Sequence, residues 1–226
     1  MELTATQKQI LAVFKASALK DLFYWSGGTV LAHYYLRHRI SLDLDFFSEQ
    51  PFVYGILEPF LVQLKRVLHL DVLEPTKIYD RWEFLIKTPE LTRFEFVYYD
   101  HDKKRLAPLE EKDGIKVDSL TDLAANKVIA YLDRNEPKDL FDLYILLANQ
   151  HFSLIELLDL VEKKFGLRVS EFQFWSESTK SLKSLKTLQP YLPKTALVRG
   201  KGLYKNIEQF FLTHGSDYIE KELADR

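Results

Sequence analysis

The chain of 226 residues contains no cysteine. This absence excludes disulfide bonds, a thiolate nucleophile and any zinc site built on cysteine. The sequence also lacks a run of about 20 apolar residues, which a membrane-spanning helix needs. Its first residues, MELTATQKQILAVFKA, lack the basic segment and following apolar segment of a secretory signal. We therefore expect a cytoplasmic location and no membrane partner.

A large excess of one charge is lacking too. The formal net charge is -2, so any contact with RNA or DNA requires a local basic patch. The basic segment best suited to phosphates is residues 194–205, which we interpret either as a solvated loop or as a nucleic-acid contact. Its basic residues are Lys194, Arg199, Lys201 and Lys205.

The distribution of apolar residues predicts an α+β fold with a helical C-terminal part. Hydrophobic residues make up 46% of the chain and charged residues 28%, as in ordinary compact proteins. Periodicity predicts a mixed sheet flanked by helices in residues 1–115 and a helical subdomain in residues 116–226. The predicted strands are 22–25, 41–47, 70–73, 82–87 and 92–99, and the predicted helices are 10–20, 29–37, 56–68, 120–133, 139–148, 154–165 and 203–212.

Two carboxylates interrupt the hydrophobic strand predicted at 41–47. Alternation along a strand places Asp43 and Asp45 on one face and their apolar neighbours on the other. Like charges this close repel each other, and a divalent cation is the usual remedy. Aspartate is also disfavoured in strands, so the pair calls for a compensating reason. The alternative is the solvated face of an amphipathic strand.

A third carboxylate would allow two metal ions to be held, as phosphoryl-transfer sites often require. Glu95 is the candidate, because it too interrupts a hydrophobic strand, Arg93-Phe94-Glu95-Phe96-Val97. A salt bridge between Glu95 and Arg93 at the rim of the sheet is the alternative. We predict a Mg²⁺ site, with two ions as one arrangement, at Asp43, Asp45 and Glu95.

A glycine turn precedes this strand. Gly27, Gly28 and Thr29 follow one predicted strand and begin a helix. Backbone N–H groups are free at such a helix start, and the lack of a Cβ lets a phosphate approach closely. The site suits a triphosphate, although an ordinary turn has the same pattern.

Four ordered motifs resemble those of a known family. The glycine turn followed by Asp43-Leu44-Asp45 resembles the signature of polymerase-β-type nucleotidyltransferases. Residues 26–32 and 39–47 are similar in particular to the AbiEii/AbiGii toxin family. Residues 122–127, with Lys127, and Arg134 followed by residues 138–143 resemble that family's later lysine and R…KDxxD motifs. The resemblance covers roughly residues 22–147.

The resemblance implies a polymerase-β-like, NTP-using enzyme. By position, Asp43, Asp45 and Glu95 would hold magnesium, whereas the glycine turn and Lys127 would hold the triphosphate. Five further residues are either catalytic or part of an ion-pair network that ties the helical part to the catalytic half. They are Asp122, Arg134, Lys138, Asp139 and Asp142.

The resemblance further implies a tRNA acceptor and a toxin role beside a cognate antitoxin. Two other functions remain open from the residues alone. One is a small-molecule adenylyltransferase of the antibiotic-modifying kind, which would share the catalytic half. The other is a non-catalytic module that acts through protein partners.

Overall fold

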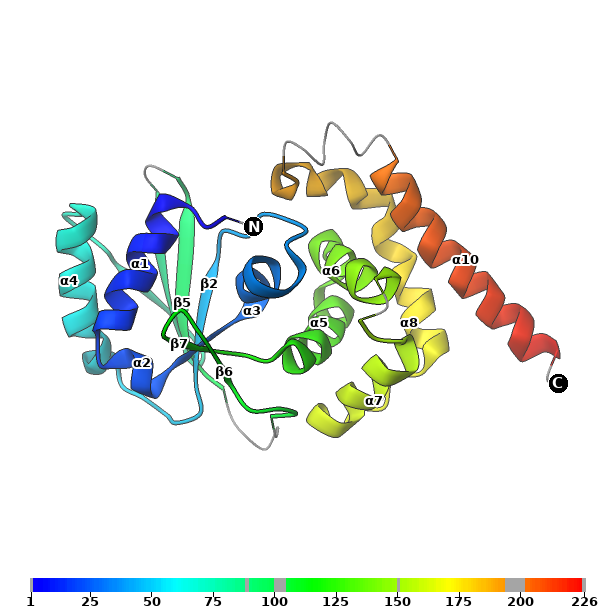
Figure 1. Ribbon diagram of the computed structural model, residues 1–226, viewed down its shortest axis with the longest axis horizontal. Helices are drawn as coiled ribbons and strands as arrows, with labels where there is room; N and C mark the ends of the chain where they lie inside the picture. Colours follow the sequence, from blue (N-terminus) through cyan, green and yellow to red (C-terminus); the bar gives the residue numbers. More distant parts are fainter. Residues whose placement is uncertain (1, 88–89, 100–104, 150, 194–201, 225–226) are drawn as a thin grey trace. The chain divides into compact units, whose positions relative to one another are not determined.

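The computed structural model describes residues 2–87, 90–99, 105–149, 151–193 and 202–224 (Figure 1). The chain divides into two compact units, the first of residues 1–103 and 107–120 and the second of residues 104–106 and 121–226. The first is built on a sheet, and the second is helical.

A mixed seven-stranded sheet forms the first unit, with strand order β3-β4-β5-β2-β1-β7-β6. Two neighbouring pairs are parallel, β2 with β5 and β1 with β7, and the other pairs are antiparallel. The strands are β1 (Tyr24–Ser26), β2 (Leu44–Ser48), β3 (Pro75–Ile78), β4 (Arg81–Ile86), β5 (Thr92–Tyr98), β6 (Glu110–Lys112) and β7 (Ile115–Val117).

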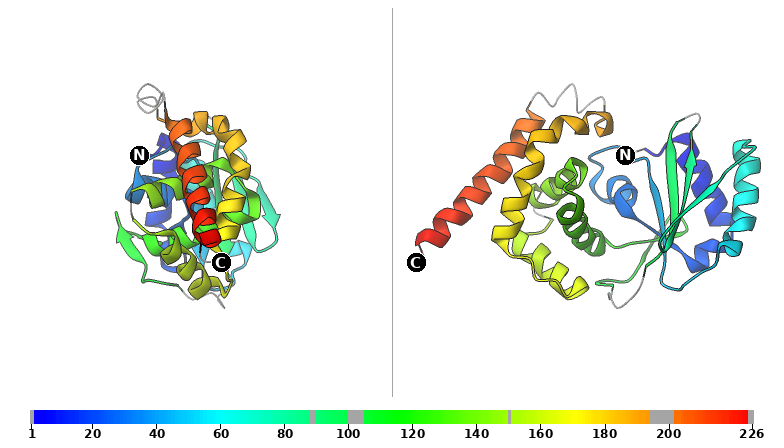
Figure 2. Two further views of the ribbon diagram at one scale, coloured as in Figure 1. Left: turned by 90° about the vertical axis from the view of Figure 1, so that its right-hand side faces the viewer. Right: turned by 180° about the vertical axis from the view of Figure 1, so that it is seen from behind.

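Helices cover both faces of this sheet (Figures 1 and 2). Aromatic rings fill the layer under α1 and α4: Phe14 of α1 stacks on Phe46 at 4.3 Å, and Phe60 of α4 lies 5.5 Å from Phe96. Residues that alternate with Phe46 and Phe96 therefore point to the opposite face. The helices of this unit are α1 (Ala5–Ala16), α2 (Leu19–Leu22), α3 (Gly27–Val30), the π-helix η1 (Leu31–Leu36), the 3₁₀-helix η2 (Tyr54–Leu57) and α4 (Glu58–Leu68).

In its described residues, the second unit packs six helical elements around one apolar core. Tyr131 and Phe174 are fully buried there, as are Ile207 and Phe211 of the last helix. The elements are α5 (Leu120–Arg134), α6 (Pro137–Ala148), α7 (Leu154–Phe165), α8 (Glu171–Ser178), the 3₁₀-helix η3 (Lys180–Tyr191) and α10 (Leu203–Ala224).

The α+β class and the helical C-terminal part are confirmed, but several predicted elements differ from the structure. The strand predicted at 70–73 is wrong, because Leu70 closes α4 through a 2.9 Å hydrogen bond to the carbonyl of Lys65. The strand predicted at 41–47 starts later, at Leu44, so Asp43 lies just before β2. The helix predicted at 10–20 is split into α1 and α2 around Ser17.

The charged stretch 100–114, which the periodicity left without structure, contains the strand β6. It forms a hairpin with β7 through Asp113 and Gly114, whose φ angles of 54° and 77° are both positive. An Asp-Gly pair favours this tight turn, because both of its central residues must take left-handed conformations. Helices α8 and η3 were also missing from the prediction, and α10 runs well beyond residue 212.

Candidate active site

A row of polar side chains crosses the sheet on the face opposite α1 and α4. Asp45 of β2 is the register partner of Glu95 on the parallel strand β5, and Ser26 on β1 is its partner on the other side. Glu95 in turn is paired with Glu83 of β4. Side chains of directly paired residues share one face of a sheet. The fold thus brings Asp45 and Glu95, which are fifty positions apart in the sequence, together.

Gly27 makes room for the carboxylate of Asp45. A Cβ added to Gly27 would lie 1.9 Å from Oδ2 of Asp45, and the φ angle of Gly27 is +80°. Both the contact and the backbone conformation therefore require glycine. The close approach of Asp45 therefore explains why the first residue of the turn is glycine.

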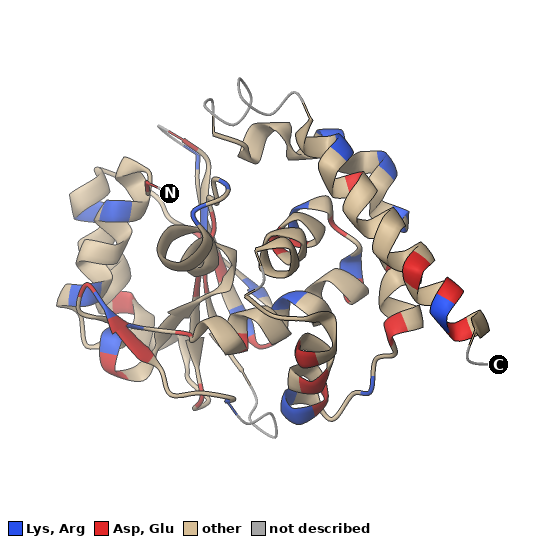
Figure 3. Ribbon diagram, turned by 45° about the vertical axis from the view of Figure 1, so that its right-hand side comes forward, with Lys and Arg blue, Asp and Glu red and all other residues tan. Residues whose placement is uncertain are grey.

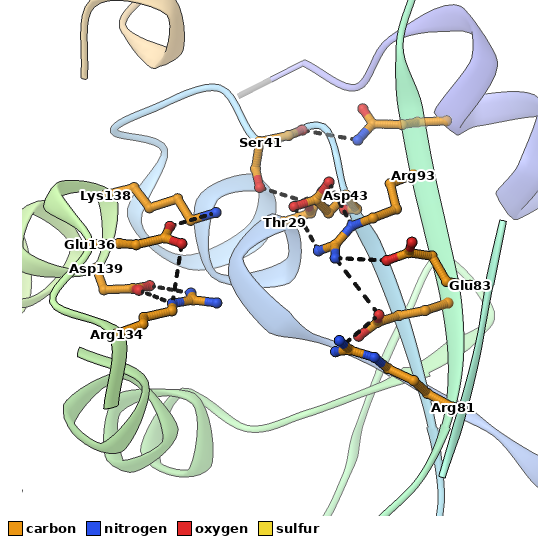
Figure 4. Close-up of polar contacts among 12 residues, drawn as sticks. Thr29, Ser41, Asp43, Arg81, Glu83, Arg93, Arg134, Glu136, Lys138 and Asp139 are labelled. Atoms are coloured by element: carbon orange, nitrogen blue, oxygen red, sulfur yellow. Dashed lines mark hydrogen bonds and ion pairs between the residues drawn. The ribbon is translucent and has the colours of Figure 1, made fainter. Parts of the chain in front are cut away.

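Arg93 links the carboxylates of this face. Its Nε and Nη2 atoms lie 3.3 and 3.1 Å from the two carboxylate oxygens of Asp43, and Nη1 lies 3.1 Å from Oε2 of Glu83 (Figure 4). Burial lowers the pKa of Arg93, but the charge and hydrogen bonds of Asp43 outweigh it and raise the pKa overall. Arg93 stays charged and fixes the orientation of Asp43.

Glu95 is the most buried carboxylate of the row, with 6% of its surface exposed. Burial raises its pKa, against the lowering effect of Arg93 and Arg81. Its Oε2 atom lies 3.5 Å from Arg81 and 3.9 Å from Arg93, yet accepts no hydrogen bond within the described ranges. A buried acceptor in this state is costly unless a ligand or water satisfies it.

Thr29 holds the segment that leads into β2. Its hydroxyl lies 2.8 Å from the hydroxyl of Ser41 and donates to the carbonyl of Asp43. The side-chain amide of Gln7 in α1 donates through Nε2 to the carbonyl of Ser41 at 2.9 Å. Thr29 is buried, so its hydrogen bond to the carbonyl of Asp43 holds the backbone of Asp43 in a fixed position.

The carboxylates of Asp43, Asp45 and Glu95 are oxygen donors of the kind that suits magnesium. In this structure, however, the three do not come together around one point. In the part of the chain that the structure describes, no three His, Cys, Asp or Glu side chains are grouped closely enough to hold a metal ion. Asp45 and Glu95 are neighbours, and Oε2 of Glu95 is an unsatisfied oxygen of the kind Mg²⁺ prefers. Asp43 instead faces Arg93.

The second unit contains a buried cluster around Lys127. Its Nζ atom lies 2.8 Å from carboxylate oxygens of both Asp139 and Asp142, which are fully buried. Arg134 also binds Asp139, through Nε at 2.6 Å and Nη2 at 2.9 Å. Burial raises the pKa of Asp139, but Lys127 and Arg134 outweigh it and lower the pKa overall. The cluster ties α5 to α6.

The two other residues expected near this cluster make separate contacts. Asp122 is fully buried and accepts hydrogen bonds from Lys164 of α7 at 2.5 Å and from the backbone N–H of Leu106 at 3.0 Å. Lys138 pairs with Glu136 at 3.0 Å, at the start of α6 (Figure 4). Asp122 therefore fastens α7 to α5, and Lys138 lies in a pair at the helix end.

Sequence reasoning missed several partners of the site. Arg81, Glu83 and Lys164 were not singled out, and Arg93 was considered only as a rim partner of Glu95. A signal was present, because Arg81-Trp82-Glu83 and Arg93-Phe94-Glu95 alternate in the same way, with opposite charges on one face. Lys164 gave no such signal, since its partner is distant in sequence.

Residues 9–214 match the family described as "Nucleotidyl transferase AbiEii toxin, Type IV TA system". The chain belongs to the AbiEii family. An uncharacterized protein of Aquifex aeolicus (strain VF5) is 27% identical to it over 97% of this chain and 98% of that protein.

Two solved structures from Helicobacter pylori share the fold of this AbiEii protein. JHP933 superimposes with a TM-score of 0.56 and 20% identity, over 99% of this chain and 96% of that one. A candidate nucleotidyltransferase gives 0.55 and 21%, over 97% and 95%. The family makes the chain a nucleotidyltransferase. Across the described ranges, none of its helices combines the length and hydropathy of a membrane span.

Proposed function

We propose that this AbiEii protein transfers a nucleotide from an NTP to a hydroxyl of tRNA, using Asp43, Asp45 and Glu95 as its catalytic carboxylates. The observation that carries the proposal is the direct pairing of Asp45 with Glu95 on parallel strands, with Gly27 shaped to receive Asp45. Two carboxylates held side by side on rigid strands suit a site for magnesium and phosphate chemistry.

In the proposed reaction, the acceptor oxygen attacks the α-phosphorus of the NTP. The new bond joins that oxygen to phosphorus, the bond to the bridging oxygen breaks, and pyrophosphate leaves with its electron pair. Glu95 would take the proton of the attacking hydroxyl. Magnesium, when bound, supplies positive charge to the phosphates, and two ions are one arrangement. Asp45 and Glu95 would hold the magnesium. Asp43 would become a further ligand once its ion pair with Arg93 is broken.

The triphosphate is proposed to lie at the turn of Gly27, Gly28 and Thr29 and to be held by Lys127. The turn begins α3, whose first backbone N–H groups have no partner within the helix, while Thr29 keeps the segment before β2 in place. Since Lys127 is bound by Asp139 and Asp142, we assign these two aspartates to positioning Lys127.

The remaining residues of the later motifs are proposed to support this arrangement. Arg134 holds Asp139, Asp122 anchors α7 through Lys164, and Lys138 pairs with Glu136 at the start of α6. The pair of Asp122 and Lys164 is buried, and removal of one partner of a buried pair strongly destabilises a protein. We assign these residues of the later motifs scaffold roles rather than contact with the reacting atoms.

The biological role proposed is that of a growth-inhibiting toxin, kept in check by a cognate antitoxin in the cytoplasm. Support comes from the family, whose description names a type IV toxin–antitoxin system. The identity of the acceptor rests on family analogy, so it needs a direct test.

The test incubates the protein with Mg²⁺ and each α-labelled NTP beside three pools: total tRNA, purified cell protein and a panel of aminoglycosides. We expect label in the tRNA pool only, and none with the Asp45→Asn variant. Labelled aminoglycoside would replace tRNA by a small-molecule acceptor, and labelled protein would indicate a partner-modifying enzyme. No label in any pool, with NTP binding intact, would support a non-catalytic module.

A further inference from the structure

A three-residue repeat runs through the second unit. Residues 180–188 read Lys-Ser-Leu, Lys-Ser-Leu, Lys-Thr-Leu. They form the first three turns of η3, a 3₁₀-helix of 12 residues (Figure 2). Such helices are usually only three or four residues long. The repeat and the unusual length of η3 call for a common explanation.

The period of the repeat equals the period of the helix. A 3₁₀-helix has 3.0 residues per turn, so side chains three positions apart lie directly above one another. In an α-helix the same side chains would drift round the axis by roughly 60° at each step. The repeat therefore produces three straight rows on η3, one of leucine, one of hydroxyl and one of lysine side chains.

The leucine row and Ser181 of the hydroxyl row attach η3 to the unit. Leu185 and Leu188 of the leucine row are buried, with 3% and 1% of their surface exposed. In the hydroxyl row, Ser184 donates to the carbonyl of Ser181 at 3.0 Å and Thr187 to that of Ser184 at 2.8 Å. Ser181 donates to the carbonyl of Asn135 at 2.6 Å. The buried leucines and the hydrogen bond from Ser181 to Asn135 fix the rotation of η3 about its axis, whereas the bonds of Ser184 and Thr187 lie within η3 itself.

The third row is left facing solvent. Lys180, Lys183 and Lys186 are all exposed. Figure 3 colours lysines and arginines blue on the ribbon. Lys180 pairs with Glu177 at 2.6 Å. Lys183 and Lys186 form no ion pair within the described ranges. Because the net charge of the chain is -2, this row is a local feature and not part of a generally basic surface.

The spacing of the row fits one kind of partner. At a rise of about 2.0 Å per residue, successive lysines are about 6 Å apart along the axis. Neighbouring phosphates along a nucleic-acid strand have a spacing of the same order. The exposed neighbours Thr187 and Gln189 are hydrogen-bonding side chains, so the row lacks the flanking apolar residues typical of a membrane-bound helix.

We infer that the lysine row of Lys180, Lys183 and Lys186 binds the phosphodiester backbone of the RNA acceptor. This inference rests on the proposed function for the role of the RNA, but the row's binding of RNA can be measured without nucleotide transfer. Contacts of this kind position a strand without reading its bases. The row would therefore hold acceptors of different sequence equally well.

Binding is measured by the anisotropy of fluorescein-labelled oligo(U) and of labelled total tRNA at several salt concentrations. The double variant Lys183→Gln/Lys186→Gln removes the two lysines that form no ion pair with a described residue. For a single strand each phosphate contact contributes about -0.7 to the slope of log K against log salt, so we expect the slope to become shallower by about 1.4. Between 50 and 200 mM salt, the variant should lose about sevenfold less affinity than the wild type.

Two controls separate the row from charge in general. Lys163→Gln/Lys221→Gln removes the same charge from exposed positions of α7 and α10, and should bind RNA like the wild type. Lys186→Thr/Thr187→Lys keeps composition and charge but moves one lysine a third of a turn off the row, and should weaken binding. Thermal unfolding of each variant checks that η3 remains folded.

Several results would overturn the inference: no RNA binding by the wild type, equal losses in the row variant and the α7/α10 control, or wild-type binding by the exchanged variant. Failure of the proposed function has a different signature. Suppose that aminoglycoside is labelled and tRNA is not, while RNA binding still depends on Lys183 and Lys186. The inference that the lysine row binds RNA is then kept, and the proposal that tRNA is the acceptor is rejected.

Discussion

Replacing Gly27 with alanine tests the geometry of the carboxylate row. The φ angle of +80° is unfavourable for any residue with a Cβ, at a cost of roughly 1–2 kcal/mol. The added Cβ would also lie 1.9 Å from Oδ2 of Asp45, and contacts under 3.0 Å are essentially never seen. The carboxylate must therefore retreat by more than 1 Å (3.0 minus 1.9).

A misplacement of about 1 Å in a catalytic group can lower the rate by about 100-fold. We expect Gly27→Ala to reduce the rate of nucleotide transfer by about this factor, and the free energy of unfolding by roughly 1–3 kcal/mol. Transfer is measured with saturating NTP on protein shown to be folded by circular dichroism. Urea unfolding gives the free energy.

Gly55 provides the matched control. A Cβ added there meets nothing within 4 Å, so Gly55→Ala should transfer nucleotide at the wild-type rate and change stability by less than about 0.5 kcal/mol. A double-mutant cycle with Asp45→Ala isolates the contact with the carboxylate, because that background loses Oδ2 and Cγ and keeps only the backbone strain and the Cβ of residue 45 at 3.1 Å. Wild-type transfer by Gly27→Ala, or additive stabilities in the cycle, would refute the reasoning.

Three further predictions concern single charged residues. Asp43→Asn should abolish transfer and leave the fold intact, because it removes the charge and barely changes the volume. Lys127→Ala should weaken the binding of all four NTPs alike, by about 1.5–3 kcal/mol. It should also lower the free energy of unfolding by roughly 3–5 kcal/mol, since Asp139 and Asp142 lose their buried partner. Because the folded pKa of Asp139 is depressed, the stability advantage of wild type over Asp139→Asn should be complete above about pH 4 and disappear as the pH falls through the folded pKa.

Each of these predictions has an outcome that would contradict it. Wild-type transfer by Asp43→Asn would remove Asp43 from the catalytic set. A loss of binding for one base alone in Lys127→Ala, measured by calorimetry, would speak against a phosphate contact. A wild-type advantage over Asp139→Asn that is unchanged between pH 7 and pH 3 in urea unfolding would mean that Asp139 gains nothing from its charge, contrary to its pairing with Lys127 and Arg134.

The sequence predicted which strands carry the acids, because Asp45 and Glu95 interrupt hydrophobic alternation in their own segments. It could not predict that the two strands are parallel neighbours in matching register, since pairing between distant segments leaves no local pattern. The place of Asp43 was also beyond it: a hydrogen bond from Thr29 holds this residue outside the strand. The ion pair between Asp43 and Arg93 likewise depends on the pairing of β2 with β5.

Two other features leave a pattern in the sequence that the helix and strand periods do not detect. The Asp113-Gly114 turn was hidden in a charged stretch, although such a pair between short strands favours a hairpin. The lysine triplets of η3 match neither the α-helical period nor the period of a strand, so periodicity predicts neither element there. The basic segment 194–201 lies outside the described residues, and Lys205 is an exposed residue of α10.

The most direct test of the central claim compares Glu95→Gln with Glu83→Gln in nucleotide transfer. The two glutamates are register partners on β5 and β4, and both face Arg93. Only Glu95 is paired with Asp45. We predict that Glu95→Gln lowers the single-turnover rate of labelling of tRNA by about 100-fold or more, as expected for loss of a group acting in proton transfer. Glu83→Gln should stay within a few-fold of the wild type, whereas equal losses in both variants, or a larger loss in Glu83→Gln, would contradict a catalytic centre at Asp45 and Glu95.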